Sequence, residues 1–214
     1  MKLFLGLFAV ELIFSMGGWA QAQATIEGHI DLPKSPTAEV INKRYESDGE
    51  PGVIIPDPPA AVVYLDGVFA PAKQPATAQM AQKNLDFVPR LLPVRVGTKV
   101  EFPNQDPTYH SVFSFSQPKR FDLGRYRGDE TPIPSVIFDK PGPVVCRCDI
   151  HENMRAIILV LLTPYFARTD AKGDYRIGGL PSGSYTFCAW LNDKTVLQKH
   201  VELQKGTTLH VNFP

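Results

Sequence analysis

From Met80 onward the chain is a close succession of short apolar segments separated by turn residues, and this pattern restricts it to β structure. No apolar repeat of 3.6 residues persists beyond two turns, as an amphipathic helix would require. The 16 glycines and 20 prolines among 214 residues supply the turns that such short strands need. The sequence therefore predicts an all-β protein, with strand spacing typical of a Greek-key sandwich or barrel plus a second small β-sandwich. The predicted strands are Ile26–Leu32, 60–67, Pro89–Val96, Thr98–Phe102, Tyr109–Phe115, Pro134–Phe138, Pro143–Cys148, Arg155–Leu162, Asp174–Ile177, Ser184–Trp190, Thr195–Leu203 and Thr207–Phe213.

The first 24 residues have the layout of a cleaved secretory signal. Lys2 gives a minimal positive start, an apolar run follows from Leu3 to Met16, and small residues end the segment. Only Glu11 interrupts the run, and an uncleaved membrane anchor is the alternative because the apolar segment is just long enough to span a bilayer. We predict a signal peptide over 1–24 and a location in the periplasm or outside the cell, without membrane attachment after cleavage.

The charge balance excludes one class of partner. The chain has 22 acidic and 22 basic side chains, so its formal net charge is zero, whereas a nucleic-acid-binding module normally carries a basic excess. We therefore expect no nucleic-acid partner. With 43% hydrophobic and 21% charged residues, the chain has the composition of a folded globular protein.

A cluster of metal-binding residue types stands in the segment CRCDIHENM. It contains Cys148, His151 and Met154 in the pattern C-x2-H-x2-M, between two apolar strands, and His110 opens a strand 38 positions upstream of Cys148. Two imidazoles, a thiolate and a weak axial thioether are the ligands of a trigonal blue-copper site. The thiolate favours Cu(I), and the imidazoles suit both oxidation states. The pattern predicts one mononuclear copper site made by His110, Cys148, His151 and Met154.

The region around these ligands resembles the cupredoxins, the small blue-copper proteins. The resemblance covers about residues 75–162 and runs through Val94 to Phe102, the Asn104-Gln105-Asp106 turn, His110 and the ligand loop. The loop is similar to that of amicyanin, and the segment 113–126 resembles cupredoxin-like proteins labelled methylamine-utilisation proteins. The resemblance implies a one-electron carrier that is not an enzyme, with His151 at the solvent edge and a redox partner protein such as a cytochrome or dehydrogenase.

Two positions depart from the family pattern. Ser111 stands where the family usually has Asn, and one hydroxyl is a weaker clasp for the ligand loop. Ile150 stands where the family often has Pro, and its backbone N–H is free to point at the sulfur of Cys148. Such a donor would stabilise the reduced site and raise its reduction potential.

Other interpretations of the ligand loop stay open. A structural zinc site could use Cys146, Cys148 and His151, although zinc has no use for Met154. The chain could also be a cupredoxin sandwich that has lost its metal. The same soft ligands would serve copper delivery, buffering or sensing, and a purely structural β-sandwich module is a further alternative.

The segment 167–190 resembles carboxypeptidase-regulatory-like domains, which are β-sandwiches related to transthyretin. Its pattern is T-D-x-x-G-x-Y-x-I-x-x-L-P-x-G-x-Y, and the first half of such a domain is found far upstream, at Ile26–Ile30 and Pro59–Leu65. We therefore expect one sandwich made of 25–67 and 166–214, with the cupredoxin domain, 75–162, inserted in it. The Pro- and Ala-rich stretch 69–79 would be a linker. The alternative is that 25–67 adds strands to the cupredoxin domain.

The three cysteines are too few for a disulfide scaffold. If Cys148 binds copper, Cys146 and Cys188 remain. Because they fall in different predicted domains, we expect two buried thiols rather than a bond between them.

Overall fold

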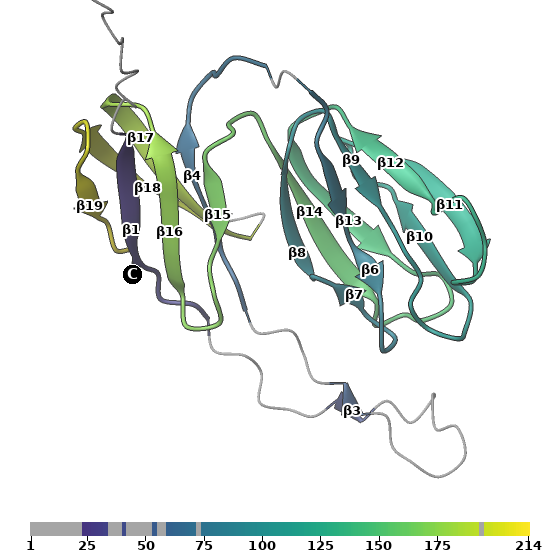
Figure 1. Ribbon diagram of the computed structural model, residues 1–214. Coiled ribbons are helices and arrows are strands. Elements are labelled where there is room, and N and C mark those ends of the chain that lie inside the picture. The colour runs from purple at the N-terminus through teal and green to yellow at the C-terminus, as the bar shows by residue number, and fades with distance from the viewer. Residues whose placement is uncertain (1–22, 34–39, 42–52, 55–58, 72–73, 193–194) are drawn as a thin grey trace, which may run out of the picture.

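The computed structural model describes residues 23–33, 40–41, 53–54, 59–71, 74–192 and 195–214, so the predicted signal peptide over 1–24 lies almost entirely outside the described residues. Every regular element in the described ranges is a β-strand. Figure 1 shows these strands arranged as two β-sandwiches beside each other. The predicted fold class, all-β with a second small sandwich, is confirmed. Among the described residues there is no helix that is long and apolar enough to cross a membrane.

The larger sandwich consists of a five-stranded and a three-stranded sheet. The five-stranded sheet has the order β11-β10-β13-β14-β8, and the three-stranded sheet has the order β12-β9-β5. A short hairpin, β6-β7, closes one edge. The strands are β5 (Thr77–Gln79), β6 (Ala81–Gln82), β7 (Phe87–Val88), β8 (Leu91–Arg95), β9 (Thr98–Glu101), β10 (His110–Ser114), β11 (Phe121–Tyr126), β12 (Ser135–Phe138), β13 (Gly142–Arg147) and β14 (Arg155–Leu161).

Alternation of side chains along these strands builds the core between the two sheets. Val144 and Cys146 of β13 are buried, whereas Arg147 at the end of the strand is exposed. Phe102 and Phe138 are fully buried in the same core. The chain passes from one sheet to the other between β8 and β9, β9 and β10, β11 and β12, and β12 and β13. These crossings make the sandwich a Greek key and bring β10 beside β13.

The smaller sandwich also has two sheets, one with the order β16-β1-β19 and one with the order β15-β4-β17-β18. Two further short strands, β2 and β3, pair with each other. The strands of the smaller sandwich are β1 (Ala24–His29), β4 (Val62–Asp66), β15 (Phe166–Arg168), β16 (Asp174–Leu180), β17 (Gly183–Asn192), β18 (Thr195–Leu203) and β19 (Thr208–His210). The separate pair consists of β2 (Val40–Ile41) and β3 (Val53–Ile54).

The smaller sandwich is made of segments from both ends of the chain. β1 pairs with β16 and β19, and β4 pairs with β15 and β17. Its core joins Ile26 and Leu65 from the first part of the chain to Phe187 and Leu203 from the last. This pairing is the one that an inserted larger domain requires, because the chain leaves the smaller sandwich after β4 and returns to it at β15.

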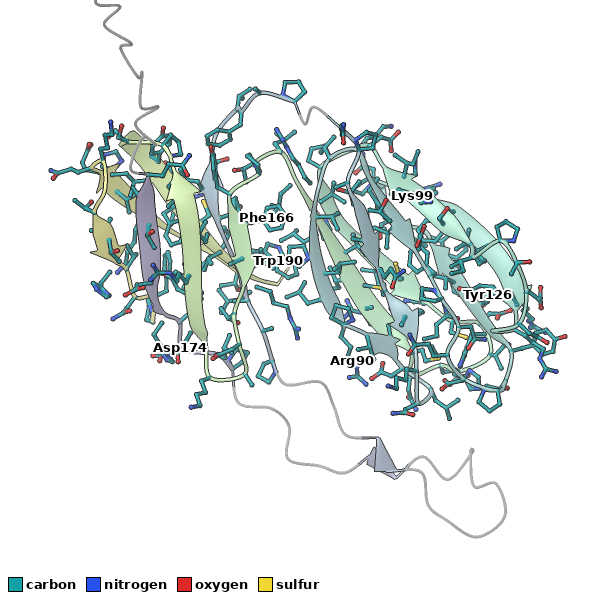
Figure 2. All side chains as sticks on the ribbon, viewed as in Figure 1. Arg90, Lys99, Tyr126, Phe166, Asp174 and Trp190 are labelled. Carbon is teal, nitrogen blue, oxygen red and sulfur yellow. The ribbon has the colours of Figure 1, made fainter. Side chains whose placement is uncertain are left out.

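A third apolar cluster joins the two sandwiches. It contains Val62 and Trp190 from the smaller sandwich and Leu91, Leu159 and Leu161 from the outer face of the five-stranded sheet, all of them buried. Figure 2 shows Trp190 and Phe166 pointing into the space between the two sandwiches. The smaller sandwich therefore packs against the β14-β8 side of that sheet, whereas Arg147 at the end of β13 and Phe115 just after β10 are exposed.

All three cysteines are free and buried. Cys146 lies in the core of the larger sandwich, and Cys188 lies on β17 of the smaller one. The expectation of two buried thiols without a bond between them is confirmed.

Candidate metal centre

Three of the four predicted copper ligands meet at one end of the larger sandwich. The ligand atoms of His110, Cys148 and His151 all lie within 4.8 Å of one another, and the three side chains are buried. His110 opens β10, whereas Cys148 and His151 belong to the turn between β13 and β14. The pairing of β10 with β13 is what brings residues almost 40 positions apart into contact.

The two imidazoles face each other through the same kind of nitrogen. The Nδ1 atoms of His110 and His151 are 3.0 Å apart, and Nδ1 of His151 lies 3.8 Å from Sγ of Cys148. Two imidazole nitrogens and one thiolate sulfur thus point toward a common position. This set of donors fits a copper ion, for which His2Cys is a preferred coordination.

A carboxylate fixes the orientation of His110. Its Nε2 atom lies 2.9 Å from Oδ2 of Asp106, and a carboxylate can only accept, so Nε2 carries the proton. The lone pair of neutral His110 is therefore on Nδ1, the atom that faces His151 and Cys148. Metal-binding histidines commonly have such a hydrogen bond from the other ring nitrogen to a carboxylate.

Asp106 is itself held by a tight turn between β6 and β7. Its carboxylate accepts hydrogen bonds from the backbone N–H groups of Asn84, at 2.7 Å, and Leu85, at 3.0 Å. Both residues have positive φ angles, 56° and 57°, and Leu rarely adopts this conformation. Burial alone would raise the pKa of Asp106, but the hydrogen bonds from Leu85, His110 and Asn84 outweigh it and lower the pKa.

Cys148 is held as a thiolate by its surroundings. Burial raises the pKa of the thiol, but hydrogen bonds from His110 and from the backbone N–H groups of Ser111, His151 and Ile150 together lower it to about 5. The same contacts with Cys148 and Asp106 raise the pKa of His110, against the opposing effect of burial. A buried thiolate already formed at neutral pH is ready to bind a soft metal ion.

The two departures from the cupredoxin pattern both contact Cys148. The backbone N–H of Ile150 donates a hydrogen bond to the sulfur, as its replacement of proline led us to expect. The backbone N of Ser111 lies 3.5 Å from the same sulfur. The Ser111 hydroxyl accepts a hydrogen bond from the Asp149 N–H at 2.9 Å and donates one to the Asp149 carboxylate. The single hydroxyl of Ser111 therefore holds the ligand loop through two hydrogen bonds, one accepted and one donated.

Arg125 extends this clasp to a third strand. Its Nε and Nη2 atoms lie 3.0 and 2.9 Å from Oδ2 of Asp149, so β11 is tied to the ligand loop. Hydrogen bonds from Arg125 and Ser111 hold the pKa of Asp149 below its usual value. The sequence did not predict a role at this site for either Arg125 or Asp106. Arg125 is 24 positions from Asp149, and Asp106 reaches His110 across an irregular turn whose shape the sequence does not specify.

Met154, the fourth predicted ligand, is fully buried in the core that contains Cys148. Its backbone N donates to His151 O at 3.0 Å, and its carbonyl accepts from Cys148 N at 3.4 Å. These bonds close the ligand loop, and a thioether bond from Met154 to copper stays a prediction. Cys146 is not part of the cluster, and burial raises the pKa of its thiol to about 12, which argues against the zinc alternative.

No protein-family model matches the chain, and no curated protein matches it. Similar solved structures include a copper-containing nitrite reductase, NirK, from Thermus scotoductus SA-01, with 29% identity and a TM-score of 0.38 over 45% of this chain and 25% of that enzyme. A purple cupredoxin from Nitrosopumilus maritimus has 20% identity and a TM-score of 0.34 over 40% of this chain and 99% of its own. A reduced mutant of amicyanin has 16% identity and a TM-score of 0.37 over 46% of this chain and 98% of its own. The chain thus spans a quarter of the nitrite reductase and nearly all of the two smaller proteins.

Proposed function

We propose that the protein is a periplasmic or secreted type 1 copper protein that carries one electron at a time and is not an enzyme. His110, Cys148, His151 and Met154 would hold one copper ion. The supporting observation is the convergence of two imidazole nitrogens and a preformed thiolate within 4.8 Å. Copper in such a site alternates between Cu(I) and Cu(II), which supplies the one-electron chemistry.

The chain's own groups fit this role. Asp106 orients His110, and Ser111 and Arg125 hold the ligand loop, so the donors stay in place whichever charge the site carries. His110 is fully buried, whereas His151 is 7% exposed. The edge of His151 is therefore the ligand edge nearest solvent and the proposed point of electron exchange with a cytochrome or dehydrogenase.

The test is copper loading of the mature chain followed by absorption spectroscopy and voltammetry. An intense visible band from thiolate-to-Cu(II) charge transfer and a reversible one-electron wave are expected. Cys148→Ser should abolish the band, whereas Cys146→Ser, in the neighbouring buried position, should keep it. A colourless protein that binds only Cu(I) would contradict electron transfer and favour copper delivery, buffering or sensing. A chain that binds no copper would contradict both.

A further inference from the structure

Two arginines lie directly opposite each other beside the ligand loop. Arg147 ends β13, Arg155 begins β14, and the two residues are register partners. Both side chains are exposed, and neither has an acidic partner within the described part of the chain. Like charges directly opposite on a sheet are destabilising. The sheet therefore carries an unneutralised pair of positive charges in a protein whose net charge is zero.

An apolar surface flanks the arginine pair. Phe113 on β10 is the register partner of Arg147, so the two side chains share one face of the sheet. Phe115, two positions on, is 77% exposed, and its ring centroid lies 5.3 Å from that of Phe113. Asp122 on β11 is the other register partner of Phe113, and its carboxylate accepts a hydrogen bond from the Gly124 N–H at 2.9 Å. We call the four residues Phe113, Phe115, Arg147 and Arg155 the Arg–Phe face.

The position of the Arg–Phe face ties it to the metal centre. Arg147 immediately precedes Cys148, and Arg155 immediately follows Met154. Arg147, Arg155 and Phe115 are exposed among the described residues, and further along β14 the same sheet packs against the smaller sandwich through Leu159 and Leu161. A protein bound here would contact Arg147 and Arg155, which are the neighbours in sequence of the proposed ligands Cys148 and Met154.

We propose that the Arg–Phe face docks a redox partner protein that presents a carboxylate-rich surface, an inference that rests on the proposed electron-carrier function. Arginine binds carboxylates bidentately, and interfaces are enriched in Arg and aromatic residues. Two adjacent guanidinium groups match a pair of carboxylates, and the Phe113–Phe115 pair supplies apolar area beside them. The partner's charge would neutralise the arginine repulsion and accelerate encounter.

The first test maps binding on the full mature chain by backbone NMR, with a hexaglutamate peptide as the probe. Chemical-shift changes are expected at Phe113, Arg147 and Arg155, and Arg147→Gln/Arg155→Gln should lose them. Lys172→Gln/Lys205→Gln, which removes the same charge from the smaller sandwich, should keep them. Shifts that are absent, that map elsewhere, or that inorganic phosphate reproduces at equal concentration would overturn the proposal. The same measurement can be made on metal-free protein. Its result therefore tests the docking proposal even if the chain binds no copper.

The second test measures electron transfer to the Cu(II)-loaded protein. Hexacyanoferrate(II) gives one electron to Cu(II), forming hexacyanoferrate(III) and Cu(I), and no bond or proton moves. We expect Arg147→Gln/Arg155→Gln to slow this reaction roughly tenfold at low ionic strength, while reduction by hexaammineruthenium(II), a cation, is not slowed. The visible band should be unchanged, which separates a docking defect from a damaged metal site. Equal rates in the arginine variant and the lysine control would overturn the proposal.

Discussion

The Nε2 atom of His110 lies 2.9 Å from Oδ2 of Asp106, whereas Nδ1 of the same ring lies 3.0 Å from Nδ1 of His151. Because this contact places the proton on Nε2, it leaves Nδ1 of neutral His110 available to a metal. Asp106 in turn is fixed by two backbone N–H groups of the β6-β7 turn. The β6-β7 turn thus determines, through Asp106, which nitrogen of the buried His110 ring carries the proton and which one is free to bind a metal.

We expect Asp106→Asn to weaken copper binding by about 10- to 100-fold, because loss of a carboxylate behind a histidine ligand weakens its donation and its orientation. Competition with a chelator of known affinity measures the effect. Asp129→Asn, which removes an exposed carboxylate that does not bond to His110, is the control. Equal affinities for the two variants would show that the Asp106 contact is only structural.

The sequence predicted the strands that carry alternating or continuous apolar residues. The predicted strand Thr195–Leu203 has the bounds of β18, and β14 differs from its prediction only by Leu162 at the end. β5 and β11 were not predicted. Thr77–Gln79 lies in the expected linker, and it becomes β5 because its backbone pairs with β9, a contact far along the chain. β11 has exposed positions along much of its length and owes its place to pairing with β10.

The convergence of His110, Cys148 and His151 could be predicted because these residue types and their local spacing are visible in the sequence. The hydrogen bonds around them could not. Ser111 and Asp149 are 38 positions apart, and Asp106 depends on a strained turn at Asn84 and Leu85. Such contacts follow from the packing of the two sheets, which a single sequence does not specify.

The metal-free protein should hold Cys148 as a thiolate down to about pH 5, since its hydrogen bonds lower the pKa to about 5. A group whose pKa is lowered on folding stabilises the fold above its ordinary pKa, and this contribution is lost as the pH falls through about 5. The ultraviolet absorbance of the thiolate, followed against pH, measures the midpoint. Cys148→Ser should remove this transition and Cys146→Ser should not. A midpoint near the ordinary pKa of a thiol would contradict the hydrogen-bond arrangement.

Gly28 on β1 should not tolerate a side chain. A Cβ atom there would lie 1.9 Å from the carbonyl oxygen of Val211, a backbone atom in the C-terminal segment beside β1. We expect Gly28→Ala to lower the free energy of unfolding by about 2–4 kcal/mol, because the clash pushes the C-terminal segment away from β1. Gly178→Ala is the matched control, since the nearest atom to its Cβ would be 3.8 Å away. Urea denaturation of both variants compares them, and equal stabilities would contradict the close approach of the two segments.

Trp190 should couple the unfolding of the two sandwiches. Its side chain is buried against Val62 and against Leu91, Leu159 and Leu161 of the larger sandwich. Trp190→Ala should cost about 3–5 kcal/mol, as for other large buried aromatic residues, and most of the loss falls on the contact between sandwiches. Calorimetry should then show two separate transitions where the wild-type chain shows one. Val196→Ala, which shortens the exposed register partner of Trp190 on β18, should leave the single transition intact. If Trp190→Ala instead lowers the midpoint temperature of a single transition, the tryptophan stabilises its own sandwich and does not couple the unfolding of the two.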